Sequence, residues 1–182
     1  MLFALKNTLI FITVLLFTTP LVSSVASAKG VFQSRADFIG EVFPNQPPQS
    51  KVLWITPELR QQAQKILGHP LYGLRIRYHR TDHKTAWILE EIGKEMPITM
   101  GVVVENHKVA LVKILAYRES RGGEVRYRAY TNQYIGMGLD SNLRLNQSVD
   151  GITGATLSVW AVNKVVNLAL YYHSLVISQT DH

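Results

Sequence analysis

The chain has 182 residues, enough for one domain with an appendage, and its 19 Lys and Arg against 13 Asp and Glu give a formal net charge of +6. It has no cysteine, which excludes disulfides, thiolate zinc sites, iron–sulfur clusters, thiol redox chemistry and C-x-x-C-H haem attachment. Because the basic residues are dispersed among acidic ones rather than gathered in a one-signed stripe, we expect no nucleic-acid partner. An acidic redox partner or an anionic membrane surface suits this charge better.

Residues 1–28 have the features of a secretory signal peptide. Lys6 precedes an apolar stretch, and Ala26 and Ala28 stand at the two small positions that signal peptidase requires. With no twin arginine in this segment, we expect export by the general secretory route, cleavage after Ala28 and a periplasmic or other extracytoplasmic location. The alternative is an uncleaved membrane anchor, although the apolar stretch is shorter than the roughly 20 residues that a span takes.

Residues 29–51 are expected to form an irregular N-terminal segment, because "FPNQPPQSK" holds three prolines. A helix should follow. Thr56 is a favourable N-cap, Pro57 fits the first helical position, and Gly68 is a favourable end.

Alternating or continuous apolar runs then predict about four strands in series. The runs are "LYGLRIRYHR", "TAWILEEIG", "PITMGVVVEN" and "KVALVKILAYR". Turns are expected at residues 81–83 and at Asn106-His107, so the strands should form an antiparallel sheet.

The segment from Glu119 to Gly151 is long for a connection, which favours a functional role, and a short helix is expected near residues 131–135. From about Thr156 to about His173 the chain is apolar over most of a helical circumference, which predicts a long buried helix. Residues 52–178 should therefore form a single α+β domain with an N-terminal helix, the sheet and a long C-terminal helix.

The stretch "DGITGATLS" stands at the start of this last helix, where unpaired N–H groups and the helix dipole favour an anion. Gly151 and Gly154 permit tight turns, and Ala155 keeps bulk away. The stretch also offers hydroxyl groups on Thr153, Thr156 and Ser158. It fits a phosphate, but it equally fits ordinary capping by Asp150, Thr153 or Thr156.

The string formed by Asp150, Thr153, Gly154, Ala155 and Thr156 resembles the flavinylation motif of the FMN-binding domain family. That family includes flavin-carrying components of the sodium-pumping NADH:quinone oxidoreductase and of the Rnf electron-transport complex. The resemblance covers roughly residues 70–171. It implies that FMN is joined to Thr156 through a phosphoester by a flavin transferase that uses FAD and magnesium.

A second stretch, "YRESRGGEVRYRAYTNQYIG", resembles the family's loop built on "ETPGLG" with a later "QF-x-G" segment. Glu119-Ser120 match the Glu-Thr of that loop, and residues 133–136 match the later segment. The sequence departs from the pattern at Arg121 and Gly122, which replace the Pro-Gly, and the leucine is absent.

The resemblance makes both stretches candidates for contact with the cofactor. Thr153 and Ser158 are expected to donate to its phosphate, and Arg118 or Arg121 to neutralise it. The full set of expected cofactor-binding residues is Asp150, Gly151, Thr153, Gly154, Ala155, Thr156, Leu157 and Ser158, with Arg118, Glu119, Ser120 and Arg121, and with Ile98, Thr99 and Tyr134 lining the flavin ring.

Other polar and aromatic residues are interpreted as structural. The histidines His69, His79, His83 and His107 show no metal-site spacing and are expected in solvated loops. The carboxylates Glu90, Glu91 and Glu95 are expected to form a surface cluster rather than a catalytic pair. Trp160 and Tyr172 are expected in the core, although Trp160, one turn past Thr156, is also placed for stacking near a flavin.

These features predict an exported flavoprotein that carries FMN on Thr156 and transfers electrons outside the cytoplasmic membrane. The expected partners are a periplasmic flavin transferase and redox proteins, including membrane-bound ones. Two alternatives stay open: a flavin-dependent reductase of a small molecule, and an accessory module of a membrane redox complex that carries no flavin.

Overall fold

The computed structural model describes residues 30–45 and 47–178, so the expected signal peptide lies outside the described residues. Five strands run in chain order, namely β1 (Gln49–Trp54), β2 (Arg75–Arg80), β3 (Lys84–Ile92), β4 (Pro97–Glu105) and β5 (Lys108–Ala116). The α-helices are α1 (Arg35–Val42), α2 (Pro57–Leu67), α3 (Arg128–Thr131) and α4 (Thr156–Ser178). Two short 3₁₀ helices, η1 (Gly123–Arg126) and η2 (Asn132–Tyr134), flank α3. The predicted α+β class is confirmed.

The strands form one antiparallel sheet in the order β1-β2-β3-β4-β5, with β1 and β5 at its edges. The tight turn between β4 and β5 lies at Asn106 and His107, whose φ angles are 50° and 60°. Positive φ at both central residues gives the turn a twist that matches the strands, which confirms this predicted hairpin.

The expectation that residues 29–51 are irregular is wrong. Residues Arg35–Val42 form α1, which begins where the Ser34 hydroxyl accepts a hydrogen bond from the Asp37 N–H at 3.0 Å. β1 begins at Gln49 and pairs with Arg80 of β2, so the sheet has five strands rather than about four. The prolines interrupt only the link between α1 and β1. As an edge strand in which Leu53 alone is buried, β1 lacks the apolar alternation that would reveal it.

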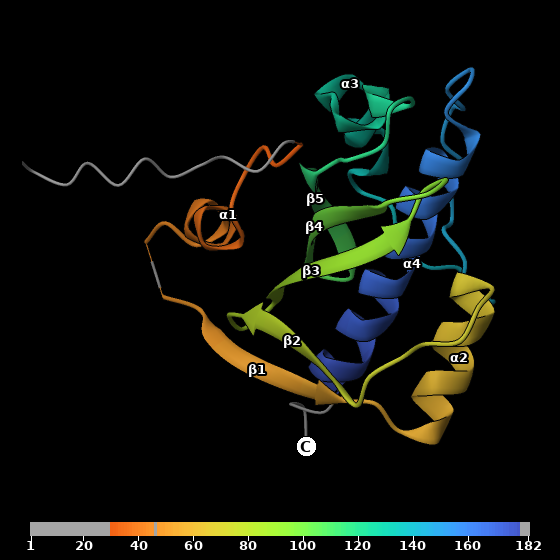
Figure 1. Cartoon of the computed structure of the whole chain (residues 1–182). Helices are drawn as coiled ribbons and strands as arrows, with labels where there is room; N and C mark the ends of the chain where they lie inside the picture. Colours follow the sequence, from red (N-terminus) through yellow and green to blue (C-terminus); the bar gives the residue numbers. More distant parts are fainter. Residues whose placement is uncertain (1–29, 46, 179–182) are drawn as a thin grey trace, which may run out of the picture.

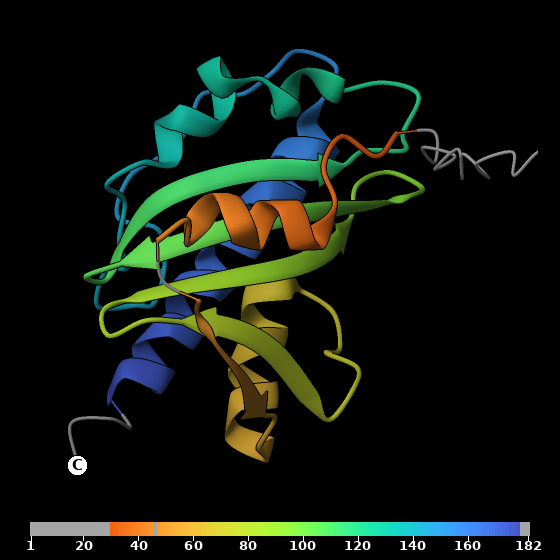
Figure 2. The same ribbon diagram turned by 90° about the vertical axis from the view of Figure 1, so that its left-hand side faces the viewer.

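The helices cover the two faces of the sheet unequally. α4 runs across one face with α2 beside it, and α1 lies on the other face (Figure 1). Figure 2, which views the molecule from the α1 side, shows α1 in front of the strands and α4 behind them. The Phe38 ring of α1 packs directly on Gly101 of β4, where an added Cβ would lie 2.4 Å from the ring. The glycine therefore allows α1 to approach the sheet.

The predicted boundaries of α2 are confirmed by its caps. The Thr56 hydroxyl accepts from the Leu59 N–H at 3.2 Å, and Gly68 ends the helix with a left-handed φ of 76°. The expected short helix near residue 131 is also present, although it begins earlier, at Arg128.

α4 has 23 residues and buries apolar side chains along its whole length, as its composition predicts. Tyr172 is fully buried against Trp87 of β3, with ring centroids 5.4 Å apart. Trp160, by contrast, is 57% exposed, so its expected place in the core is wrong. It falls on the more exposed stripe of α4, which faces away from the sheet. Among the helices that the structure describes, none has the length and apolarity needed to cross a membrane.

Candidate functional site

A cavity of about 560 Å³ lies at the N-terminus of α4. Three segments that are distant in sequence form it: the turn between β3 and β4, the loop that follows β5, and the first turn of α4. The lining residues are Lys94, Glu95, Glu119, Ser120, Arg121, Gly154, Ala155, Thr156, Leu157 and Ser158. The fold thus brings most of the residues singled out in the two motif stretches to one place.

Thr156 is the first residue of α4, and its side chain is exposed to the cavity. Gly154 has a φ of 81°, and the Ala155 N–H closes a turn on the Ile152 carbonyl at 2.9 Å. Within residues 30–45 and 47–178, the Thr156 hydroxyl has no hydrogen-bond partner. The first N–H groups of a helix also lack partners within it. The cavity therefore contains the Thr156 hydroxyl, which has no hydrogen-bond partner among the described residues, and the N–H groups of the first helical turn.

Ser158 is buried, and its hydroxyl is engaged. The Tyr117 hydroxyl donates to the Arg121 carbonyl, so its oxygen accepts the Ser158 proton across 2.9 Å. Burial raises the pKa of Tyr117, which keeps the phenol protonated and able to donate. The Ser158 hydroxyl therefore donates its hydrogen bond to Tyr117. Contrary to the expectation from the sequence, it does not point at a phosphate site in this structure.

Gly122 lies where the loop after β5 meets α4. Its φ is 81°, and an added Cβ would lie 2.8 Å from the Tyr117 hydroxyl and 2.9 Å from the Ser158 hydroxyl. Both the backbone conformation and the lack of space require glycine here. This glycine therefore allows the close contact between the loop and the helix.

Glu119 holds the opposite rim of the cavity in place. Its Oε1 accepts three backbone hydrogen bonds, from the N–H groups of Lys94, Glu95 and Met96, at 2.6, 2.7 and 2.9 Å. Burial would raise the pKa of Glu119, but these donors outweigh it and lower the pKa below its ordinary value. The ionised carboxylate thereby fixes the β3–β4 turn against the loop after β5.

The remaining residues of the Asp150 motif lie beside the cavity rather than in it. Asp150, Gly151 and Thr153 do not line it. The Asp150 N–H donates to the Gln133 side chain at 2.8 Å. The two sequence segments that resemble the family motifs therefore contact each other.

The four remaining predicted residues lie outside the cavity lining. Arg118 lines another cavity of about 650 Å³, which shares Glu119 and Ser120 with the Thr156 cavity. Ile98 and Thr99 are buried on β4, and Thr99 donates to Glu90 at 3.0 Å. Tyr134 is fully buried, and its hydroxyl donates to the side-chain amide oxygen, Oδ1, of Asn163 at 2.6 Å. Burial raises the pKa of Tyr134, as expected for a phenol in the core.

Sequence reasoning missed several residues that build the site. Lys94 and Glu95 line the cavity from a strand turn, and Tyr117 ties the loop to α4. No motif joins these positions to residue 156. Glu119 was predicted through the match of Glu119-Ser120 to the family's loop, but that match did not reveal from which N–H groups its carboxylate accepts.

Glu91 differs from the surface carboxylate expected at this position. Its side chain is 5% exposed, with His69 Nε2 at 3.0 Å and Lys164 Nζ at 3.2 Å. Glu90 and Glu95 are at the surface, where they pair with Arg35 and Lys94. Across the part of the chain that the structure describes, no group of three or more His, Cys, Asp or Glu is placed to hold a metal ion.

Comparison with known proteins gives one family match. Residues 93–171 match the model described as the FMN-binding domain, a range that runs from the β3–β4 turn almost to the end of α4. It therefore contains every lining residue of the Thr156 cavity. No curated protein matches the chain.

Proposed function

Residues 93–171 place this chain in the FMN-binding domain family, and from this premise we propose an exported electron carrier that holds FMN covalently on Thr156. The single observation that carries the proposal is the Thr156 hydroxyl, which is exposed, unengaged among the described residues and located in the cavity at the start of α4.

The residues around Thr156 fit a phosphate group. The first-turn N–H groups of α4 and the helix dipole favour a negative charge beside the hydroxyl. Four charged residues line the cavity. Lys94 pairs with Glu95, and Glu119 accepts from the backbone of the β3–β4 turn, so the exposed Arg121 is the cation that would balance the phosphate charge. Ala155, which is 4% exposed and abuts Gly122, leaves room for the ester.

The attachment is a phosphoryl transfer to an alcohol. The Thr156 hydroxyl loses its proton and forms a bond to the phosphorus nearer the flavin in FAD. The pyrophosphate bond breaks, and AMP leaves with that electron pair. The chain contributes an accessible alcohol beside the unpaired N–H groups at the start of α4, whereas the flavin transferase supplies the FAD and magnesium chemistry.

Export makes a covalent bond useful. Residues 1–28 resemble a secretory signal, and a chain threaded out unfolded cannot carry a folded cofactor pocket with it. A phosphoester retains the flavin without a deep enclosed site. The bound flavin supplies the redox chemistry that a chain without cysteine otherwise lacks.

Intact-mass measurement tests the proposal on protein from a host that expresses the flavin transferase. We expect the added mass of an FMN moiety, and yellow fluorescence that survives a denaturing gel. Thr156→Val should abolish both. The matched control is Thr81→Val, which alters a threonine in the turn between β2 and β3, outside both motif stretches and outside the cavity lining, and should leave both signals. Fluorescence that persists in Thr156→Val would overturn the assignment of the attachment residue.

A further inference from the structure

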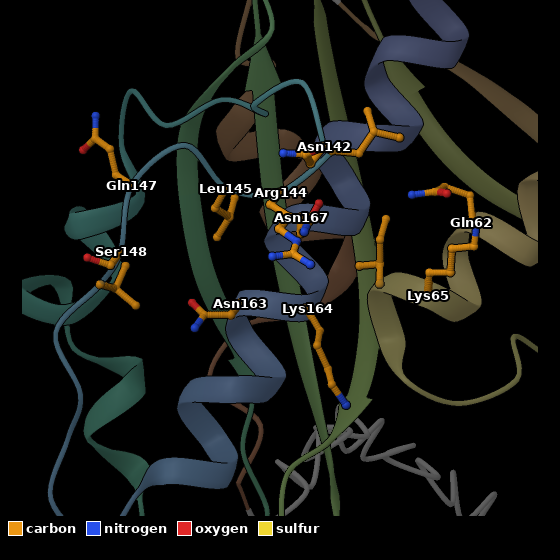
Figure 3. A pocket seen from close by; sticks show the side chains of 13 residues that line it. Gln62, Lys65, Asn142, Arg144, Leu145, Gln147, Ser148, Asn163, Lys164 and Asn167 are labelled. Carbon is orange, nitrogen blue, oxygen red and sulfur yellow. The ribbon is translucent and has the colours of Figure 1, made fainter.

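A third cavity, of about 650 Å³, lies between α2, α4 and the loop that precedes α4 (Figure 3). Lys65 and Gln62 border it from α2, and Asn163, Lys164 and Asn167 border it from α4. The loop contributes residues 142–145 and 147–149. This cavity, here called the α2–α4 groove, shares no lining residue with the Thr156 cavity.

The α2–α4 groove is positively charged. Lys65, Arg144 and Lys164 line it, and none of the described residues that line it is acidic. Lys164 is paired with the buried Glu91, whereas the Lys65 and Arg144 side chains have no acidic partner among the described residues. The nearby Asp140 carboxylate accepts from the backbone N–H groups of Asn142 and Arg144 at 2.8 and 2.9 Å. Two cations are therefore available to an anion in the groove.

The groove also contains a buried acceptor that lacks a donor. Asn167 Oδ1 is shielded from solvent and has no hydrogen-bond partner in the part of the chain that the structure describes. An unsatisfied buried acceptor is unfavourable, so a ligand that brings a donor to it gains affinity. The neighbouring Asn163 uses its carbonyl oxygen to accept from Tyr134, which leaves its NH₂ group as a donor.

We propose that the α2–α4 groove binds an oxyanion that also carries a hydroxyl donor. Lys65 and Arg144 bind the anionic oxygens. The Asn167 amide turns about its side-chain bonds on binding, so that Oδ1, which is shielded from solvent in the unbound protein, accepts from the ligand hydroxyl. Hydrogen phosphate and hydroxycarboxylates share this chemistry. The site is independent of the proposed flavin on Thr156, because the two cavities share no lining residue.

Two pairs of probe anions distinguish the contribution of the ligand hydroxyl to binding from the contribution of the ligand charge. Hydrogen phosphate and sulfate are both tetrahedral anions, but only hydrogen phosphate carries an O–H donor. Citrate and tricarballylate differ only in the hydroxyl. Calorimetric titration of the purified protein with each should show that the hydroxyl-bearing member of at least one pair binds about tenfold more tightly than its partner. The pair that discriminates identifies the source as phosphate or hydroxycarboxylate.

Variants assign the binding to the groove. Arg144→Gln should weaken binding about tenfold. Asn167→Leu should remove the discrimination within the pair while leaving the hydroxyl-free anion unaffected. The matched controls, Arg77→Gln and Lys51→Gln, alter exposed cations on β2 and β1 and should have no effect. Equal affinity within both pairs, no saturable binding by any probe, or binding that Arg144→Gln leaves unchanged would each overturn the proposal.

Discussion

Tyr117 and Ser158 are joined by a hydroxyl–hydroxyl hydrogen bond of 2.9 Å, which ties the loop after β5 to the first turn of α4. The Tyr117 hydroxyl also donates to the Arg121 carbonyl, so one phenol orients both walls of the Thr156 cavity. The position of Thr156 relative to the loop thus depends on Tyr117, which was not among the residues predicted to form the site.

Tyr117→Phe removes this hydroxyl and should lower the free energy of unfolding by about 1–2 kcal/mol, because the Arg121 carbonyl and Ser158 lose their shared partner. Urea denaturation measures the loss. Ser158→Ala provides the second arm of a double-mutant cycle. The two losses should not add, since both remove the same bond. Full additivity would show that the bond contributes nothing.

Gly122→Ala should be more destabilising than Gly154→Ala, although the φ of both glycines is 81°. Alanine at either site adds the strain of a left-handed conformation, about 1 kcal/mol. At position 122 the new Cβ also meets Tyr117 and Ser158, whereas at position 154 it meets no described residue within 4 Å other than its chain neighbours. Overpacking adds about 1–3 kcal/mol.

Thermal and urea unfolding of the flavin-free proteins compares these two variants directly. Gly154→Ala serves as the control for backbone strain alone. Equal losses of stability in the two variants would show that the close contact at Gly122 relaxes without cost.

Glu119→Gln should destabilise the protein at neutral pH by about 1–3 kcal/mol, since a charged acceptor of three N–H groups is replaced by a neutral one. The folded protein lowers the pKa of Glu119. Its contribution is therefore present above the unfolded pKa, about 4.3, and is lost as the pH falls through the folded pKa.

Urea denaturation at a series of pH values should show the difference between Glu119→Gln and the unmodified protein shrinking in acid. Glu95→Gln is the control, because its side chain is 71% exposed and pairs with Lys94 at the surface. We expect that variant to change stability by less than about 0.5 kcal/mol. A difference for Glu119→Gln that stays constant down to acid pH would contradict the charge-based account.

His173 should make the protein sensitive to acid. It is buried, its Nε2 accepts from the His107 N–H at 3.3 Å, and its Nδ1 therefore donates to Thr85 at 2.8 Å. Burial, with His107 and Arg80 nearby, lowers the pKa of His173 to about 4. The unfolded chain, with a histidine pKa of about 6.5, binds more protons between these values, so stability falls as the pH drops from about 6.5 to about 4.

The expected loss over that range is roughly 3 kcal/mol, and His173→Gln should flatten it. Stability measured by urea denaturation between neutral and acid pH provides the test. His83→Gln alters an exposed histidine and should leave the acid dependence unchanged. If the His173→Gln variant loses as much stability in acid as the unmodified protein, groups other than His173 cause the acid sensitivity.

Local sequence signals predicted most of the elements, because their causes are local. Thr56 and Gly68 define α2 through a cap and a left-handed end, and Asn106-His107 define a two-residue turn. Neither α1 nor β1 could be predicted in this way. α1 is held by Phe38 packing on Gly101, some sixty positions away, and β1 by pairing with β2. Trp160 was misplaced because an apolar composition does not say which stripe of α4 faces away from the sheet.

The amino-acid sequence was sufficient to show that Thr156 begins a buried helix after a glycine turn, since capping, turn conformation and apolar periodicity depend on neighbouring residues. It also associated Glu119 and Ser120 with Thr156, through the resemblance of two stretches to one family. The folded chain was needed to show that Glu119 accepts from the β3–β4 turn, that Ser158 is committed to Tyr117 and that Tyr134 lies in the core. These outcomes depend on contacts between segments distant in the chain, and such contacts follow from the packing of α4 on the sheet rather than from any local pattern.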